Sequence, residues 1–310
     1  MHRRAVLTGA GALLMAAGLM AVPAVVQPAA GQVSPEIESL MTRVGERVAA
    51  YHRRAQTIIC VNESTVQPIS NSLSPAGLSR TVESELRVDS TAAYAGQLPA
   101  ATMIRDITRI NGRAPRERNR TDRSGCTDPS PLSPEPLAFL LPAGRSEYRF
   151  TSVRAAKEND RTALLVDFTT AHRSSALELI EDPNGHDDCF DWSGPVATTG
   201  RLWIDASTFD VLRVDRHLDG PVELRVSARI QNRHGLPAWV TLDRDDQTMR
   251  FRPVPFHDPE EVLLLPQSIE SLTLLRGGLQ SVRRTETFSR YRRFLGAGRV
   301  IKSPIDRHPH

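Results

Sequence analysis

The chain has 310 residues, of which 40% are hydrophobic, and its 39 Lys and Arg against 36 Asp and Glu give a formal net charge of +3. This balance excludes the concentrated basic face that nucleic-acid binding needs. Beyond the first 31 residues no stretch is apolar enough for a stable membrane span, which takes about 20 residues.

Residues 1–31 predict a cleavable export signal. Arg3 and Arg4 precede an apolar run at 5–26, and small residues before Gln32 mark the cleavage point. A membrane anchor is the alternative, but prolines and glycines weaken it. The paired arginines also resemble the twin-arginine signal, so this route and the general secretory route both stay open. We expect the mature chain, 32–310, to be periplasmic or secreted, with its charge lowered from +3 to +1 by the loss of Arg3 and Arg4.

An oxidising compartment favours one disulfide among the three cysteines. Cys126 and Cys189 lie in polar, turn-like sequence, whereas Cys60 lies in the apolar stretch 58–61. We predict a Cys126–Cys189 bond, which would stabilise the fold by about 4 kcal/mol, and a packed Cys60 thiol.

An amphipathic helix is predicted over 35–54, after the cap Ser34. Its apolar positions recur at helical spacing: Ile37, Leu40, Met41, Val44 and Val48. A strand follows from residue 57. Alternation predicts further strands over 82–88 and 104–110, the latter running into the hairpin turn Asn111-Gly112.

The middle of the chain predicts a surface loop over 115–135 and a short helix from Ser133 to Leu141. Strands over 148–153 and 163–168 pair around a turn at 157–160.

The C-terminal half alternates more clearly. A hairpin joins 201–205 to 211–217, and strict alternation predicts one strand over 222–230. Further strands are expected near 238–243, 247–252, 267–275 and 279–291, and the tail at about 303–310 is expected to be disordered. We therefore predict an α+β, mostly β fold: one domain with a large curved, half-barrel-like antiparallel sheet and an N-terminal amphipathic helix.

Three segments carry a resemblance to known proteins. Residues 104–115, the hairpin 200–214 and the ending 287–294 resemble elements of a group of exported bacterial proteins of unknown role. More distantly, a helix followed by a curved sheet with this hairpin is similar to the LolA-like lipoprotein-carrier superfamily. That resemblance implies a half-barrel around a hydrophobic cavity that accepts acyl chains, but it carries over no ligand-contacting residue.

No pattern predicts a catalytic, cofactor-binding or metal-binding residue. The histidines are scattered without a zinc-ligand spacing, and no nucleophile elbow occurs. Carboxylates at 243–246 and 260–261 lie in turn-like sequence and are expected to be solvated. Arginines on the predicted strands are expected to pair with Asp and Glu across neighbouring strands: Arg225, Arg229, Arg283, Arg284, Arg290, Arg292 and Arg293.

The leading hypothesis is an exported, non-enzymatic domain that holds a hydrophobic small molecule, a lipid or a protein segment against the apolar side of the sheet, beneath the helix 35–54. The candidate cavity residues are Val44, Val48, Leu224, Val226 and Trp203. The alternatives are a structural or protein-interaction module of the cell envelope, with the sheet filled by side chains, and an unrecognised hydrolase.

Overall fold

The computed structural model describes residues 34–55, 57–90, 101–115, 137–172, 177–182, 189–257 and 259–293. These all belong to the larger of two units into which the chain divides, 33–310. The predicted signal segment, the loop from 116 and the tail lie outside the described residues.

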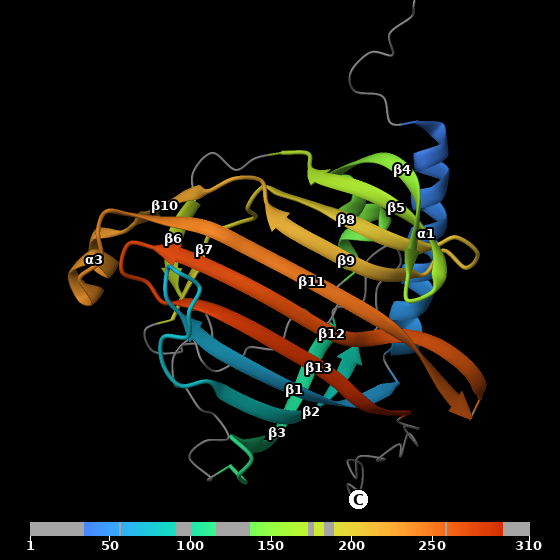
Figure 1. Ribbon diagram of the computed structural model, residues 1–310, viewed down its shortest axis with the longest axis horizontal. Helices are drawn as coiled ribbons and strands as arrows, with labels where there is room; N and C mark the ends of the chain where they lie inside the picture. Colours follow the sequence, from blue (N-terminus) through green and yellow to red (C-terminus); the bar gives the residue numbers. More distant parts are fainter. Residues whose placement is uncertain are drawn as a thin grey trace, which may run out of the picture. The chain divides into compact units, whose positions relative to one another are not determined.

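Helix α1, Pro35–Ala55, confirms the predicted amphipathic helix (Figure 1). Its five predicted apolar positions are all buried. Glu36 and Glu38 lie in the first turn and Arg53 and Arg54 in the last, where each charge interacts favourably with the helix dipole.

The rest of the described chain is mostly β, as predicted. The strands are β1 (Ile58–Ile69), β2 (Arg80–Ser90), β3 (Ala101–Ile110), β4 (Tyr148–Glu158), β5 (Arg161–Thr170), β6 (Leu177–Glu181), β7 (Phe190–Trp192), β8 (Thr198–Asp205), β9 (Val211–Leu218), β10 (Val222–Val226), β11 (Trp239–His257), β12 (Glu260–Arg276) and β13 (Ser281–Arg293). They form one open sheet in the order β3-β2-β1-β13-β12-β11-β9-β8-β5-β4, with β10, β6 and β7 attached through β11. Pairing is antiparallel except between β10 and β6.

Several predicted turns are confirmed by their backbone. Asn111 and Gly112 both have positive φ, as the predicted hairpin turn requires. Asn159 and Asp160 also have positive φ, between β4 and β5, within the predicted turn at 157–160.

The predicted strand over 222–230 is wrong in its second half. The chain leaves β10 at Val226 and forms helix α3, Ala228–His234. The Ser227 hydroxyl accepts a hydrogen bond from the Ile230 N–H, and Gly235 ends the helix with φ 68°. Local capping therefore overrides the period-two pattern.

The prediction of two strands at 238–243 and 247–252 is also wrong, because both lie in the single long strand β11. The acidic stretch between them is accommodated by a β-bulge between Leu242 and Arg244. Asp243, Asp245 and Asp246 are thus strand residues rather than turn residues.

The short helix predicted up to Leu141 is replaced by two pieces: a 3-10 helix at Ala138–Leu140 (η3) and helix α2, Pro142–Arg145. Ser133, its expected start, lies outside the described residues.

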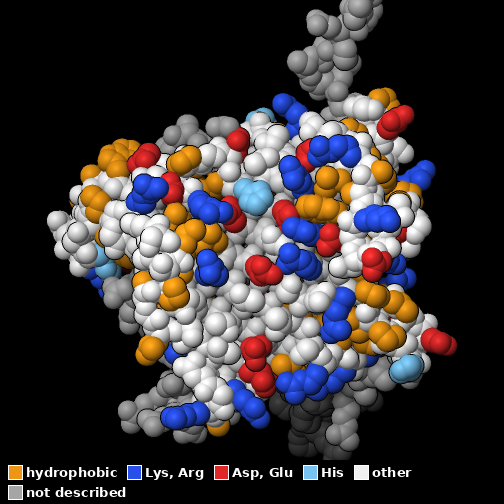
Figure 2. Space-filling view, viewed as in Figure 1, with side chains coloured by type: hydrophobic (Ala, Val, Ile, Leu, Met, Phe, Trp, Pro, Cys, Tyr) orange, Lys and Arg blue, Asp and Glu red, His pale blue; other side chains and the backbone are white. Residues whose placement is uncertain are grey.

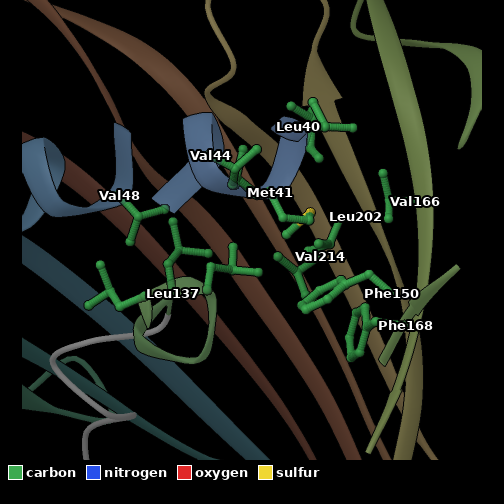
Figure 3. Close-up of a cluster of buried hydrophobic side chains, with 14 of the residues drawn as sticks. Leu40, Met41, Val44, Val48, Leu137, Phe150, Val166, Phe168, Leu202 and Val214 are labelled. Carbon is green, nitrogen blue, oxygen red and sulfur yellow. The ribbon is translucent and has the colours of Figure 1, made fainter. Parts of the chain in front are cut away.

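Two large apolar clusters form the core. The first lies between α1, residues 137–141 and strands β4, β5, β8, β9, β11 and β12 (Figure 3). The second lies between β6, β9, β10, α3, β11 and β12. A smaller cluster, including Ile58, Val254 and Phe256, packs against Tyr51 near the end of α1.

Three further expectations bear on this fold. Cys60 is a free, partly buried thiol, as predicted, and burial raises its pKa to about 12. Cys126 lies outside the described residues, so its bond to Cys189 stays a prediction. Among the helices of the described chain, none has the length and apolar character that crossing a membrane requires.

Truncating a side chain of the first cluster should destabilise the fold. Leu202 is fully buried, so Leu202→Ala is expected to lower the free energy of unfolding by about 2–5 kcal/mol. Leu78 is 92% exposed, so Leu78→Ala, the same chemical change, should leave it nearly unaltered. Urea unfolding of both variants measures the difference, and equal losses would contradict this assignment of the core.

Candidate functional site

The sheet has an inner face, which carries α1, and an outer face opposite to it. On β9 the inner-face positions are Val214, Arg216 and Leu218, because side chains alternate along a strand. Val214 belongs to the first apolar cluster and Leu218 to the second. Arg216 therefore lies between the two clusters.

The same arrangement repeats on β12 and β11. On β12, Ile269 is in the first cluster and Leu275 in the second, with Ser271 and Thr273 between them on the same face. The register pairs Asp245 with Thr273 and Gln247 with Ser271. Residues directly opposite in an antiparallel pair share a face, so polar side chains separate the clusters on three strands.

This polar strip continues across the next strands. On β13, Glu286 and Arg284 lie opposite Ile269 and Ser271, and on β1 Ser64 lies opposite Glu286. Asn62 lies two residues before Ser64 and opposite Ser84 of β2. We call the set the inner polar band: Arg216, Asp245, Gln247, Ser271, Thr273, Arg284, Glu286, Asn62, Ser64 and Ser84.

Asp245 is the acidic group at the β11 end of the inner polar band. Its Oδ1 accepts a hydrogen bond from the Thr273 hydroxyl (3.2 Å), and its Oδ2 lies 3.9 Å from the Arg216 guanidinium. Burial raises the pKa of Asp245 above its ordinary value, although Arg216 and Thr273 oppose this. The carboxyl is thus poorly solvated but not isolated.

Glu286 is the second acidic group and is only 2% exposed. Asn62 Nδ2 donates to its Oε2 at 3.2 Å, and Arg284 Nη1 lies 3.8 Å from its Oε1. Burial again raises the pKa, against the opposing effects of Arg284 and Asn62.

Some polar atoms of the band are buried without a hydrogen bond. Among the described residues these include Ser64 Oγ, Glu286 Oε1 and Arg216 Nε. A buried polar atom without a partner costs about 1–3 kcal/mol. These three atoms lower the stability of the fold within one continuous strip of polar side chains, which makes the inner polar band the candidate functional site.

The two acidic groups of the band do not form a catalytic pair. Asp245 and Glu286 are separated by two strand spacings and by four residues along β12, or about 17 Å for ordinary sheet dimensions. Paired carboxylates in glycosidases lie about 5–9.5 Å apart. Within the described residues, no three His, Cys, Asp or Glu side chains gather closely enough to hold a metal ion.

Three hollows adjoin α1. Between the helix and the sheet a space of about 20 Å³, lined in part by Val48, Leu137 and Phe251, has room for one water. On the flanks of the N-terminal half of α1 lie two larger hollows. One of about 420 Å³ is lined in part by Leu40 and Phe209, and one of about 270 Å³ in part by Ile37 and Tyr148.

The predicted cavity residues lie in three separate places. Val44 and Val48 are buried in the first cluster, and Val48 lines the 20 Å³ space. Leu224 and Val226 are buried in the second cluster. Trp203 is paired with Arg213 on the outer face, where the guanidinium stacks 4.4 Å from its ring. The structure does not bring these five residues together.

The outer face is a surface of mixed charges (Figure 2). Six of the seven predicted arginines form ion pairs, including Arg225 with Glu178 and Arg292 with Glu85. His217 lies 3.3 Å from Asp246 on this face. The exposed pairs among these contribute little stability each. The predicted pairing across neighbouring strands is confirmed for Arg225 and Arg293. Arg290 and Arg292 instead reach β2 across β1, Arg229 lies in helix α3, and Arg284 pairs with Glu286 of its own strand within the inner polar band.

Sequence reasoning missed the inner polar band. Asp245 was expected to be a solvated turn residue, and that expectation is wrong: its side chain is 16% exposed in mid-strand. The sequence signal that could have found it is the alternation along the strands. Glu286 and Asn62 stand at alternate positions of β13 and β1 whose other side chains face the core.

Comparisons with known proteins give distant similarities in fold. No family model matches the chain, and no curated protein matches it. A putative outer membrane lipoprotein-sorting protein domain from Vibrio parahaemolyticus has 12% identity and a TM-score of 0.40, covering 84% of this chain and 94% of that one. A LolA superfamily protein from Nitrosomonas europaea has 11% identity and a TM-score of 0.33, covering 82% and 93%. MucB in complex with MucA(peri) has 11% identity and a TM-score of 0.21, covering 82% and 99%. The chain is distantly similar to LolA superfamily structures.

The burial of Glu286 predicts a pH dependence of stability. Its pKa is raised in the folded state, so folding favours the protonated form, and this contribution is lost as pH rises above about 4.5 through the folded pKa. Glu286→Gln should therefore gain stability relative to the wild type as pH rises from 4 to 8. Urea unfolding across this range measures it. Glu260→Gln, at an exposed position, should show no such trend, and a trend of opposite sign for Glu286→Gln would contradict the burial argument.

Proposed function

We propose that this chain is an exported, non-enzymatic binding domain, and that its inner face holds an amphipathic ligand such as a lipid or an acylated molecule. The observation that carries the proposal is the inner polar band between two apolar clusters. A sheet that only filled its own interior would gain stability from apolar side chains at these positions. Polar groups retained there at a cost suit a ligand that has a polar part and an apolar part.

The polar part of the ligand would lie along the band and meet Arg216 on β9 and Glu286 on β13, which are about 16 Å apart for ordinary sheet dimensions. Charged hydrogen bonds in a poorly solvated site are stronger than those in water, so these groups would fix the ligand's orientation. The apolar part would lie beside the first cluster, against the face of α1 that carries Val44 and Val48.

Helix α1 would act as the movable cover. Its polar side is held by ion pairs at the surface: Arg47 with Asp210 (2.8 Å), Glu38 with Arg145 (3.1 Å) and Arg54 with Glu261 (3.8 Å). Exposed pairs of this kind contribute about 0–1 kcal/mol each. The hollows on both flanks of α1 leave room for it to shift when a ligand enters.

Native mass spectrometry of protein purified from its own host tests the ligand. The wild type should retain a lipid-sized mass that an organic solvent releases. The double variant Arg216→Gln/Glu286→Gln should weaken ligand binding by at least about tenfold, because the loss of one charged hydrogen bond alone costs about that much and the variant removes two charged groups.

The matched control is Arg250→Gln/Glu270→Gln, which makes the same two substitutions on the outer face, at an Arg and a Glu that lie 2.8 Å apart. It should leave ligand occupancy unchanged. Wild-type protein that carries no such mass would contradict the proposal, as would equal losses in both double variants.

Export itself has a separate test. If residues 1–31 are a cleaved signal, the protein recovered from the cell envelope or medium should begin at Gln32. N-terminal peptide mass mapping measures this. An N-terminus at Met1 in a membrane fraction would support the anchor instead.

Replacing Arg3 and Arg4 by lysine should abolish export only if the twin-arginine route is used.

A further inference from the structure

Strand β4 ends the sheet on the side of the first cluster. It pairs along its length with β5, from Tyr148↔Thr170 to Glu158↔Arg161. On its other side, no strand in the described part of the chain pairs with it. Its outward N–H and C=O groups therefore form an open edge, which is a template for another strand.

This edge is little protected by its own side chains. Residues 151–155 are all exposed, including Val153 at 39%. Natural edges are often interrupted by a bulge, and β4 has one at Ser152, with φ 47° and a register shift between Thr151 and Val153. Residues 153–158 continue beyond it in unbroken register, which leaves a six-residue segment whose alternate residues offer N–H and C=O groups to a partner.

The 270 Å³ hollow lies beside the start of the same edge. Ile37 and Met41 of α1 form one side, Tyr148 and Phe150 of β4 another, and Pro142 also contributes. Phe150 belongs to the first cluster, so this part of β4 presents its inner face to the hollow. An apolar side chain from a strand added beside β4 would reach apolar surface there.

The charges along the edge favour an acidic partner. Arg149 and Lys157 are exposed, and neither forms an ion pair with another described residue. Arg154 is already paired with Asp167 (2.8 Å), and Glu158 lies 3.8 Å from Arg213. The charges left for a partner on β4 are therefore positive. Because the bulge shifts the alternation, Arg149 lies on the outer face and Lys157 on the inner face.

We propose that β4 binds an extended, acidic protein segment by strand addition, with an apolar side chain of the segment in the hollow between α1 and β4. The backbone hydrogen bonds supply the affinity, and the hollow and the two basic side chains supply the selectivity. This interaction is separate from the ligand proposed for the inner polar band.

The probe is a fluorescently labelled eight-residue peptide in which glutamate alternates with leucine or valine, with two adjacent glutamates at one end so that both faces of the added strand carry a carboxylate. Fluorescence anisotropy should show that it binds the full chain, and hydrogen–deuterium exchange should show slower exchange at 148–158 in the complex. A peptide with lysine in place of glutamate, and a scrambled acidic peptide without alternation, should bind at least about tenfold more weakly.

The test variant is Arg149→Glu/Lys157→Glu, which should weaken binding of the acidic peptide by about tenfold or more. Arg283→Glu, an exposed arginine on β13, is the control and should have no effect. Circular dichroism confirms that each variant is folded. Absence of binding at millimolar peptide, protection confined to segments other than 148–158, or an unchanged affinity in the double variant would overturn the proposal.

The two proposals fail independently. The inner-band variant Arg216→Gln/Glu286→Gln should bind the peptide as the wild type does, and the β4 variant should retain the lipid-sized mass. Loss of peptide binding in both double variants would indicate a general disturbance of the fold and would overturn the assignment to β4.

Discussion

The alternation of side chains along a strand governs this structure, because it gives a large sheet one face that must be kept from water. The described chain supplies one long helix, a few short segments and the strands β6, β7 and β10 to cover that face. The inner face therefore carries two large apolar clusters. Helix α1 packs on the first, and β10 and α3 contribute to the second. Between the covers the side chains of the inner face change from apolar to polar. The inner polar band thus lies between the two parts of the inner face that α1 and the segment β10–α3 cover.

Much of the architecture was predictable from local signals. The spacing of Ile37 to Val48 predicted α1, and Asn111-Gly112 predicted a turn that the backbone confirms. Two predictions failed where a local feature, a helix cap in one case and a β-bulge in the other, competes with the alternation of apolar and polar residues along a strand. Ser227 and Gly235 cap a helix inside an alternating run, and the bulge after Leu242 carries an acidic stretch through the middle of a strand.

The candidate site was not predictable in the same way. Asp245 and Glu286 are far apart in sequence and meet the same band only through the register of β11, β12 and β13. In the sequence, Glu286 is distinguished from the exposed acidic residues of other strands by its position in the alternation of β13, not by its neighbours along the chain. The charge pairing of the outer face was easier to foresee, because opposite charges on neighbouring strands pair wherever the register allows.

The position of β13 has a consequence for how the chain reaches its native state. β1 lies between β2 and β13, so residues 58–69 pair with residues 281–293 in the interior of the sheet. Strands β1 to β3 join the others only through this last strand. Strands β1 to β3 therefore cannot complete their pairing until almost the whole polypeptide has been synthesised. Until then, the edge of β1 that pairs with β13 is unpaired. Such a high contact order implies slow folding, and a chain that stops before residue 281 would leave two disconnected sheets.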